Sequence, residues 1–224
     1  MSPLAFRERP AAGDPHGLLV LHHGRGTDEH DLLSLGDALD PQRRMHIVTP
    51  RGPLTLPDWP GYHWYSVPRV GHPDPETFHA AYDELAAFHD ELWRRTALAP
   101  ASTVLGGFSM GSVMSYSLGL GADRPVPAGI LAFSGFVPIV EEWHPELASR
   151  EGLHAFIAHG RRDPVIDVAL ARRARDQLQA GGLDVEYHES NVAHNIDPVH
   201  VDVAGDWLER ILPTTARCSA SRAG

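Results

Sequence analysis

The sequence predicts an α/β fold with a mostly parallel central sheet and helices on both faces. Two observations carry this prediction. Short apolar runs of strand length alternate with longer segments of helical periodicity along the 224 residues. A serine flanked by glycines also follows an apolar, β-branched run and precedes a helical one, so it lies at a strand-to-helix turn.

Composition and charge limit the classes of protein that fit. With 42% hydrophobic residues, we expect one globular domain over residues 1–213 and a flexible tail at 214–224. No window approaches the about 18 apolar residues of a membrane span, so we expect no stable membrane insertion and a cytoplasmic location. A net charge of −10 argues against nucleic-acid binding, whereas a homodimer stays open. The single Cys218 excludes an internal disulfide.

The first third of the chain predicts strand, helix and strand. Leu18 to Leu21 is an apolar run of strand length, bounded by a Gly-rich and His-rich loop. Residues 32–39 have helical periodicity and stop before Pro41, and the β-branched pair at 47–48 predicts the next strand.

Residues 51–74 predict a long ordered loop, because they contain five prolines, three glycines, two tryptophans and two tyrosines. Loops of this length inside compact domains are usually functional. Its aromatic side chains either form a wall of an apolar substrate pocket or attach the loop to the body of the protein. The candidate pocket residues are Trp59, Tyr62, Trp64 and Tyr65 and, from a later loop, Phe136.

The rest of the chain continues the alternation of strands and helices. Asp74 before Pro75 predicts the start of an amphipathic helix, with Asp as its N-cap. The later strands are expected at 103–105, 130–133, 155–158 and 185–188. Helices are expected after 111, at 169–178 and from 198 to about 212, the last one with Asp197 as its N-cap.

The segment Gly107-Phe108-Ser109-Met110-Gly111 fits the G-x-S-x-G pattern of a nucleophile elbow. Such a turn holds the serine in strained backbone geometry, and the crowding around it requires small residues two positions before and after. The alternative is a glycine-rich turn that does no chemistry. The strand-turn-helix context favours the elbow.

A serine nucleophile needs a base and a group that orients the base. Asp163 and His194 follow later strands, so parallel strands would bring both to the same sheet edge as Ser109. His194 would then exchange the proton of Ser109, and Asp163 would hold the imidazole. Asp167 is the alternative acid, but we expect it to be the N-cap of the following helix. For the base, His200 falls inside the last predicted helix, and His159 is expected at the end of a strand with the hydrogen bonds of its ring satisfied.

Acyl transfer also needs donors for the developing oxyanion. The backbone N–H of Met110 follows the nucleophile, and that of Arg25 lies in the loop after the first predicted strand. His22 and His23 show no recognisable zinc-ligand spacing. We therefore expect neither a metal nor a cofactor.

The motifs His-Gly-Arg-Gly, Gly-Phe-Ser-Met-Gly, His-Gly-Arg-Arg-Asp-Pro-Val and Ala-His-Asn, in that order, resemble the phospholipase/carboxylesterase family of α/β-hydrolases, which includes acyl-protein thioesterase-like enzymes. The resemblance covers roughly residues 18–212. It implies an α/β-hydrolase fold without a separate lid domain and a serine esterase acting on small-molecule carboxylic esters or thioesters. Ser109, Asp163 and His194 would be its triad. Met110 stands where the thioesterase branch often has glutamine. The alternative is a non-catalytic small-molecule binding protein with a vestigial triad.

Overall fold

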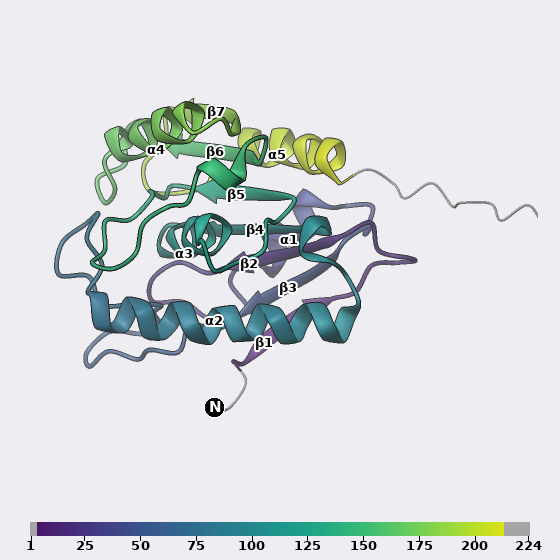
Figure 1. Cartoon of the computed structure of the whole chain (residues 1–224), viewed down its shortest axis with the longest axis horizontal. Helices are drawn as coiled ribbons and strands as arrows, with labels where there is room; N and C mark the ends of the chain where they lie inside the picture. The colour runs from purple at the N-terminus through teal and green to yellow at the C-terminus, as the bar shows by residue number, and fades with distance from the viewer. Residues whose placement is uncertain (1–3, 213–224) are drawn as a thin grey trace, which may run out of the picture.

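The computed structural model describes residues 4–212 and contains a seven-stranded sheet in the order β1-β3-β2-β4-β5-β6-β7 (Figure 1). Strands β2 to β7 run parallel, and β1 pairs antiparallel with β3 at one edge. The strands are β1 (Phe6–Arg9), β2 (Leu18–His22), β3 (His46–Pro50), β4 (Thr103–Phe108), β5 (Gly129–Phe133), β6 (His154–Gly160) and β7 (Asp184–Ser190). The predicted mostly parallel α/β sheet is confirmed.

Helices cover both faces of the sheet. One core cluster joins the sheet to α2, α3 and α4, and a second joins it to α1 and α5. Figure 1 shows the first group in front of the strands. The helices are α1 (Leu33–Leu39), α2 (Pro75–Thr96), α3 (Met110–Leu120), α4 (Val168–Ala180) and α5 (Pro198–Ile211). None of these helices is both long and apolar enough to cross a membrane.

The predicted helix starts are confirmed by their caps. The Asp74 carboxylate accepts the Thr77 backbone N–H at 3.0 Å at the start of α2. Asp167 and Asp197 accept backbone N–H groups in the first turns of α4 and α5 in the same way. An aspartate at this position satisfies one of the N–H donors that a helix leaves unpaired.

The edge strand β1 is the main element that the sequence did not predict. Its residues Phe-Arg-Glu-Arg contain one apolar side chain, so neither an apolar run nor a clear alternation marks them as a strand. Charged side chains are common on edge strands because they discourage pairing with other chains. The flexible tail expected at 214–224 lies outside the described residues.

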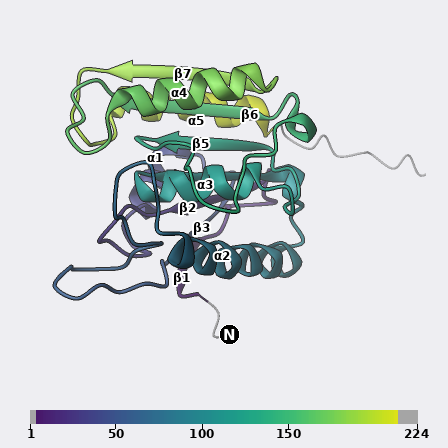
Figure 2. The same ribbon diagram turned by 60° about the vertical axis from the view of Figure 1, so that its left-hand side comes forward.

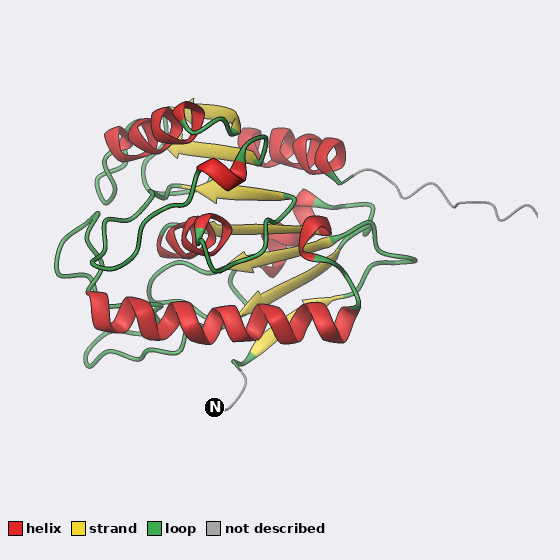
Figure 3. Cartoon of the chain, in the orientation of Figure 1, coloured by secondary structure: helices red, strands yellow, loops and turns green. Residues whose placement is uncertain are grey.

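The loops that follow the parallel strands meet at the carboxyl edge of the sheet. In Figure 3 the arrows of the parallel strands point toward this edge. Residues 51–74, here called the aromatic loop, contain no helix or extended strand and include isolated bridges such as that between Leu54 and His63. Figure 2 shows the long blue loop between β3 and α2 projecting beyond the end of the sheet. The edge is therefore surrounded by loops from distant parts of the chain.

Candidate active site

Ser109 occupies a strained turn between β4 and α3. Its φ is +56°, in the region that L-residues rarely adopt. A Cβ added at Gly107 would lie 2.7 Å from the carbonyl oxygen of His22, and one added at Gly111 would overlap that same oxygen. The two glycines therefore let the strand and the helix approach β2 closely enough to form the turn.

His194 and Asp163 form a continuous hydrogen-bond chain with Ser109. The His194 Nε2 lies 2.9 Å from the Ser109 Oγ, and its Nδ1 lies 2.6 Å from the Asp163 Oδ2. The other oxygen of Asp163 accepts the backbone N–H groups of Val165 and Ile166 at 2.8 and 2.9 Å. Since the carboxylate can only accept, the imidazole proton belongs on Nδ1, which leaves Nε2 as the acceptor toward Ser109.

The environment of Asp163 keeps its carboxyl group ionised. Burial by itself raises the pKa of this fully buried side chain. The hydrogen bonds from His194 and from the two backbone N–H groups outweigh burial, so the pKa lies below its usual value. The ring of Phe108 lies against the His194 imidazole, with ring centroids 4.9 Å apart.

The rival residues named from the sequence have other partners. Asp167 caps α4, and His200 is buried within α5. The His159 Nε2 donates to the Ile166 carbonyl at 2.8 Å and lies 3.3 Å from the Asp163 Oδ2. We expected a satisfied His159 ring, but its Nδ1 is buried without a partner among the described residues. The structure thus brings together the three preferred residues.

His23 connects the loop after β2 to the aromatic loop, a role that the sequence did not reveal. Its Nδ1 donates to the Gly24 carbonyl at 2.7 Å, and its Nε2 accepts the Gly52 N–H at 2.8 Å. Burial lowers the pKa of His23 despite the Gly24 hydrogen bond and nearby acids, which favours the neutral ring that these two bonds require. No sequence signal pointed to this role, because the two partners are far apart along the chain.

The two proposed oxyanion donors line one cavity with Ser109. Met110 is the first residue of α3, where helix geometry leaves the N–H without an intrahelical acceptor. The loop around Arg25 is held by the next residue, Gly26, which has a φ of +82° and donates its N–H to the Tyr62 carbonyl at 2.9 Å. The described hydrogen bonds of residues 4–212 include none from the Arg25 N–H.

The cavity has a volume of about 670 Å³ and is mainly apolar. Trp59, Tyr65 and Phe136 line it, as the sequence predicted for a pocket wall. Trp64 and Tyr62 do not, and the expectation was wrong for these two. Trp64 is fully buried, and its Nε1 donates to the His23 carbonyl at 3.0 Å. It supports the loop after β2 through this hydrogen bond.

A second group of buried polar residues comes from β2, α2 and α3. The His22 Nδ1 lies 2.8 Å from the Ser115 Oγ, and its Nε2 lies 3.2 Å from the His89 Nε2. Burial lowers the pKa of His22, and it lowers that of His89 to about 3. Both rings are therefore neutral near pH 7, and their hydrogen bonds join β2, α2 and α3.

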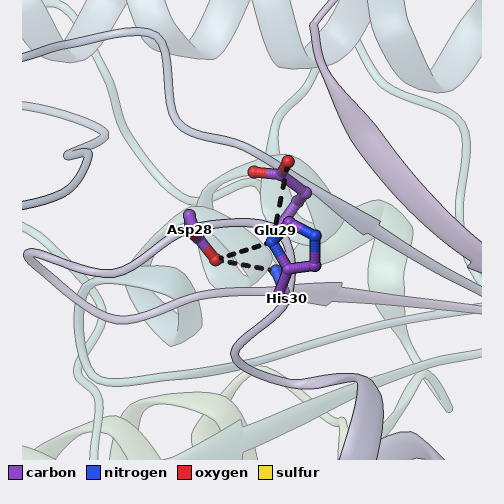
Figure 4. Close-up of side chains that lie close together, drawn as sticks. All are labelled: Asp28, Glu29 and His30. Atoms are coloured by element: carbon purple, nitrogen blue, oxygen red, sulfur yellow. Dashed lines mark hydrogen bonds and ion pairs between the residues drawn. The ribbon is translucent and has the colours of Figure 1, made fainter.

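Asp28, Glu29 and His30 form a set of potential metal ligands within 4.8 Å of one another (Figure 4). Their donor atoms already have protein partners. Glu29 accepts two hydrogen bonds from Arg51 at 2.5 and 2.6 Å. The His30 Nε2 accepts one from Arg7 at 2.8 Å, so the proton of the neutral ring lies on Nδ1, 3.2 Å from the Asp28 Oδ1. The Asp28 carboxylate accepts the His30 backbone N–H at 2.9 Å. This set therefore connects β1, the loop after β2 and the aromatic loop.

Several known proteins with similar sequences or structures are hydrolases. A model of the phospholipase/carboxylesterase family matches residues 9–212. The chain is 27% identical over 229 residues to acyl-protein thioesterase 1 of Neurospora crassa, covering 92% of this chain and 91% of that protein. It is 26% identical over 200 residues to the putative hydrolase MhqD of Bacillus subtilis, covering 89% and 96%. The crystal structure of esterase PE8 matches with a TM-score of 0.79 and 30% identity over 93% of this chain and 99% of that one.

Proposed function

Because the chain belongs to the phospholipase/carboxylesterase family of hydrolases, we propose that it cleaves small carboxylic esters or thioesters with Ser109 as the nucleophile. The fold is the α/β-hydrolase fold, and the similarity to esterases supports the assignment as an enzyme. The proposal adds the residues and the steps of the reaction.

The reaction would proceed in two halves. His194 takes the proton of Ser109 while the Oγ attacks the substrate carbonyl, and the N–H groups of Met110 and Arg25 stabilise the resulting oxyanion. The tetrahedral intermediate then collapses. The leaving alcohol or thiol takes the proton from His194, and an acyl-enzyme ester remains on Ser109. His194 then removes a proton from water, which attacks this ester. As the second tetrahedral intermediate collapses, the Ser109 oxygen leaves with the proton from His194 and the carboxylic acid is released.

One observation carries the proposal: the unbroken hydrogen-bond chain from Asp163 through His194 to Ser109, at 2.6 and 2.9 Å, in the wall of a cavity. A purely structural set of these groups would have no need of the strained backbone at Ser109. The apolar lining favours an acyl or alcohol group of moderate size. The cytoplasmic location is part of the same proposal.

The test combines labelling with turnover. A fluorophosphonate probe should modify Ser109, and p-nitrophenyl esters of increasing chain length should be hydrolysed until the acyl chain exceeds the cavity. S109A should lose both labelling and turnover. The matched control is S117A on the same helix, because the Ser117 hydroxyl only donates to the Val113 carbonyl within α3. Full esterase activity in S109A would refute the assignment, and saturable binding without turnover would identify a binding protein.

A further inference from the structure

The side chain of Arg25 is an unpaired cation in the wall of the candidate active site. It lines the same cavity as Ser109 and His194, and among residues 4–212 it is the only arginine or lysine to do so. Within residues 4–212 its Nε is buried without a hydrogen-bond partner, and the side chain forms no ion pair. The terminal nitrogens are not among the buried unpartnered atoms. A partly desolvated guanidinium gains stability from an acceptor, and a ligand in the cavity can supply one.

The guanidinium stacks on one aromatic ring, and contacts of the two neighbouring glycines hold the backbone of Arg25. Its Cζ lies 4.0 Å from the ring centroid of Trp59, so the face of the group is covered by the aromatic loop. A Cβ on Gly24 would come within 3.1 Å of the Phe108 ring, and the N–H of Gly26 is bonded to the aromatic loop. Stacking occupies the face of a guanidinium and leaves its in-plane N–H donors free for a bidentate carboxylate.

Among the described residues that line the cavity, Asp31 carries the only carboxylate, and no second arginine or lysine is present. Asp31 also lines the cavity, but it is exposed, its Oδ2 accepts the Thr27 hydroxyl at 3.1 Å, and it forms no ion pair with Arg25. Burial, together with the charge of Arg25, lowers the pKa of the neighbouring His63, which stays neutral near pH 7. Burial raises the pKa of Tyr65, so its hydroxyl remains a protonated donor in the cavity wall.

We propose that Arg25 forms a subsite for a carboxylate on the substrate, so that the enzyme prefers esters of short dicarboxylic acids with one free acid group. The inference deepens the proposed function and rests on it. The backbone N–H of Arg25 is the proposed oxyanion donor, so its guanidinium can reach only a group a few bonds from the scissile carbonyl. This distance favours monoesters of succinic, glutaric or adipic acid over longer ones.

The experiment compares matched substrates. kcat/KM is measured for the monoethyl esters of the three acids and for the same esters with the free acid capped as an uncharged amide. A charge-assisted bidentate contact at a partly exposed site should raise kcat/KM for the ester with the free acid group about tenfold over that for the capped ester. R25M should abolish the preference, and R25K should retain part of it, because an ammonium lacks the planar fork. R69M, an exposed arginine of the aromatic loop, is the matched control and should keep the preference.

The ratio of kcat/KM for the free-acid ester to that for the amide-capped ester separates recognition of the carboxylate from other effects of the substitution. If Arg25 only anchors the aromatic loop through Trp59, R25M lowers both rates equally, and the subsite is refuted. Wild-type enzyme without a preference for the acid refutes it too. Calorimetry of glutarate with S109A and S109A/R25M gives a readout without turnover. If glutarate binds S109A but not S109A/R25M and the wild-type enzyme cleaves no ester, the subsite stands and the serine hydrolase is rejected. If the wild-type enzyme cleaves esters but glutarate binding does not depend on Arg25, the subsite is rejected and the hydrolase stands.

Discussion

Asp163→Asn tests the role of the hydrogen-bond chain most directly. One oxygen of Asp163 accepts two backbone N–H groups, so in the variant only the amide oxygen can occupy that place. The amide NH₂ must then face the His194 Nδ1, which has to accept instead of donate. The imidazole proton moves to Nε2 and points at Ser109, and the base is lost.

The expected loss of kcat follows from this tautomer change and is about 10⁴-fold. The fold should survive. The two backbone hydrogen bonds remain, but the charge-assisted bond to His194 is lost. The new NH₂ also faces the His159 Nε2, which lies 3.3 Å from the replaced oxygen and is itself a donor. We expect the free energy of unfolding to fall by about 1–3 kcal/mol. Urea denaturation measures this change.

The assay is p-nitrophenyl acetate hydrolysis across pH, with D167N as the matched control. Asp167 lies four residues away and caps α4, where asparagine serves nearly as well, so D167N should change neither activity nor stability measurably. A folded D163N variant that keeps more than about a tenth of wild-type kcat would refute the reasoning from the tautomer.

Three further predictions concern the support of the site. Gly111→Ala should lower the free energy of unfolding by about 3 kcal/mol or more and abolish turnover, because the added Cβ overlaps the His22 carbonyl oxygen. Thermal unfolding measures the loss of stability, and an unchanged midpoint would contradict the overlap. The hydrogen bonds from Arg51 lower the pKa of Glu29 to about 2, so this pair stabilises the fold above about pH 4.5 and loses that contribution as pH falls toward 2. Glu29→Gln should flatten the dependence of the unfolding free energy on pH, measured by urea titration. An unchanged dependence would exclude the pair as its source. His23→Phe should lower the free energy of unfolding by about 1–3 kcal/mol, because the buried Gly52 N–H loses its acceptor. It should also lower kcat more than it raises KM, and a change confined to KM would show that the ring does not position the oxyanion donor.

The sequence alone indicated the parallel sheet, the helix caps at Asp74, Asp167 and Asp197, and the turn at Ser109. These features depend on local chemistry: apolar periodicity, N-cap side chains and the glycines of the turn. The chain order of the polar loops then selected Asp163 and His194, because parallel strands deliver their following loops to one edge.

Only the tertiary structure decided which aromatic side chains face the cavity and which partners the loops find. Trp59 and Trp64 lie in the same loop and look alike in sequence, yet Trp59 lines the cavity and Trp64 is fully buried away from its lining. The bond between His23 and Gly52 and the stacking of Arg25 likewise join residues that no local pattern relates. Periodicity reports which side of an element is apolar, whereas contacts between loops depend on how the folded sheet places their ends.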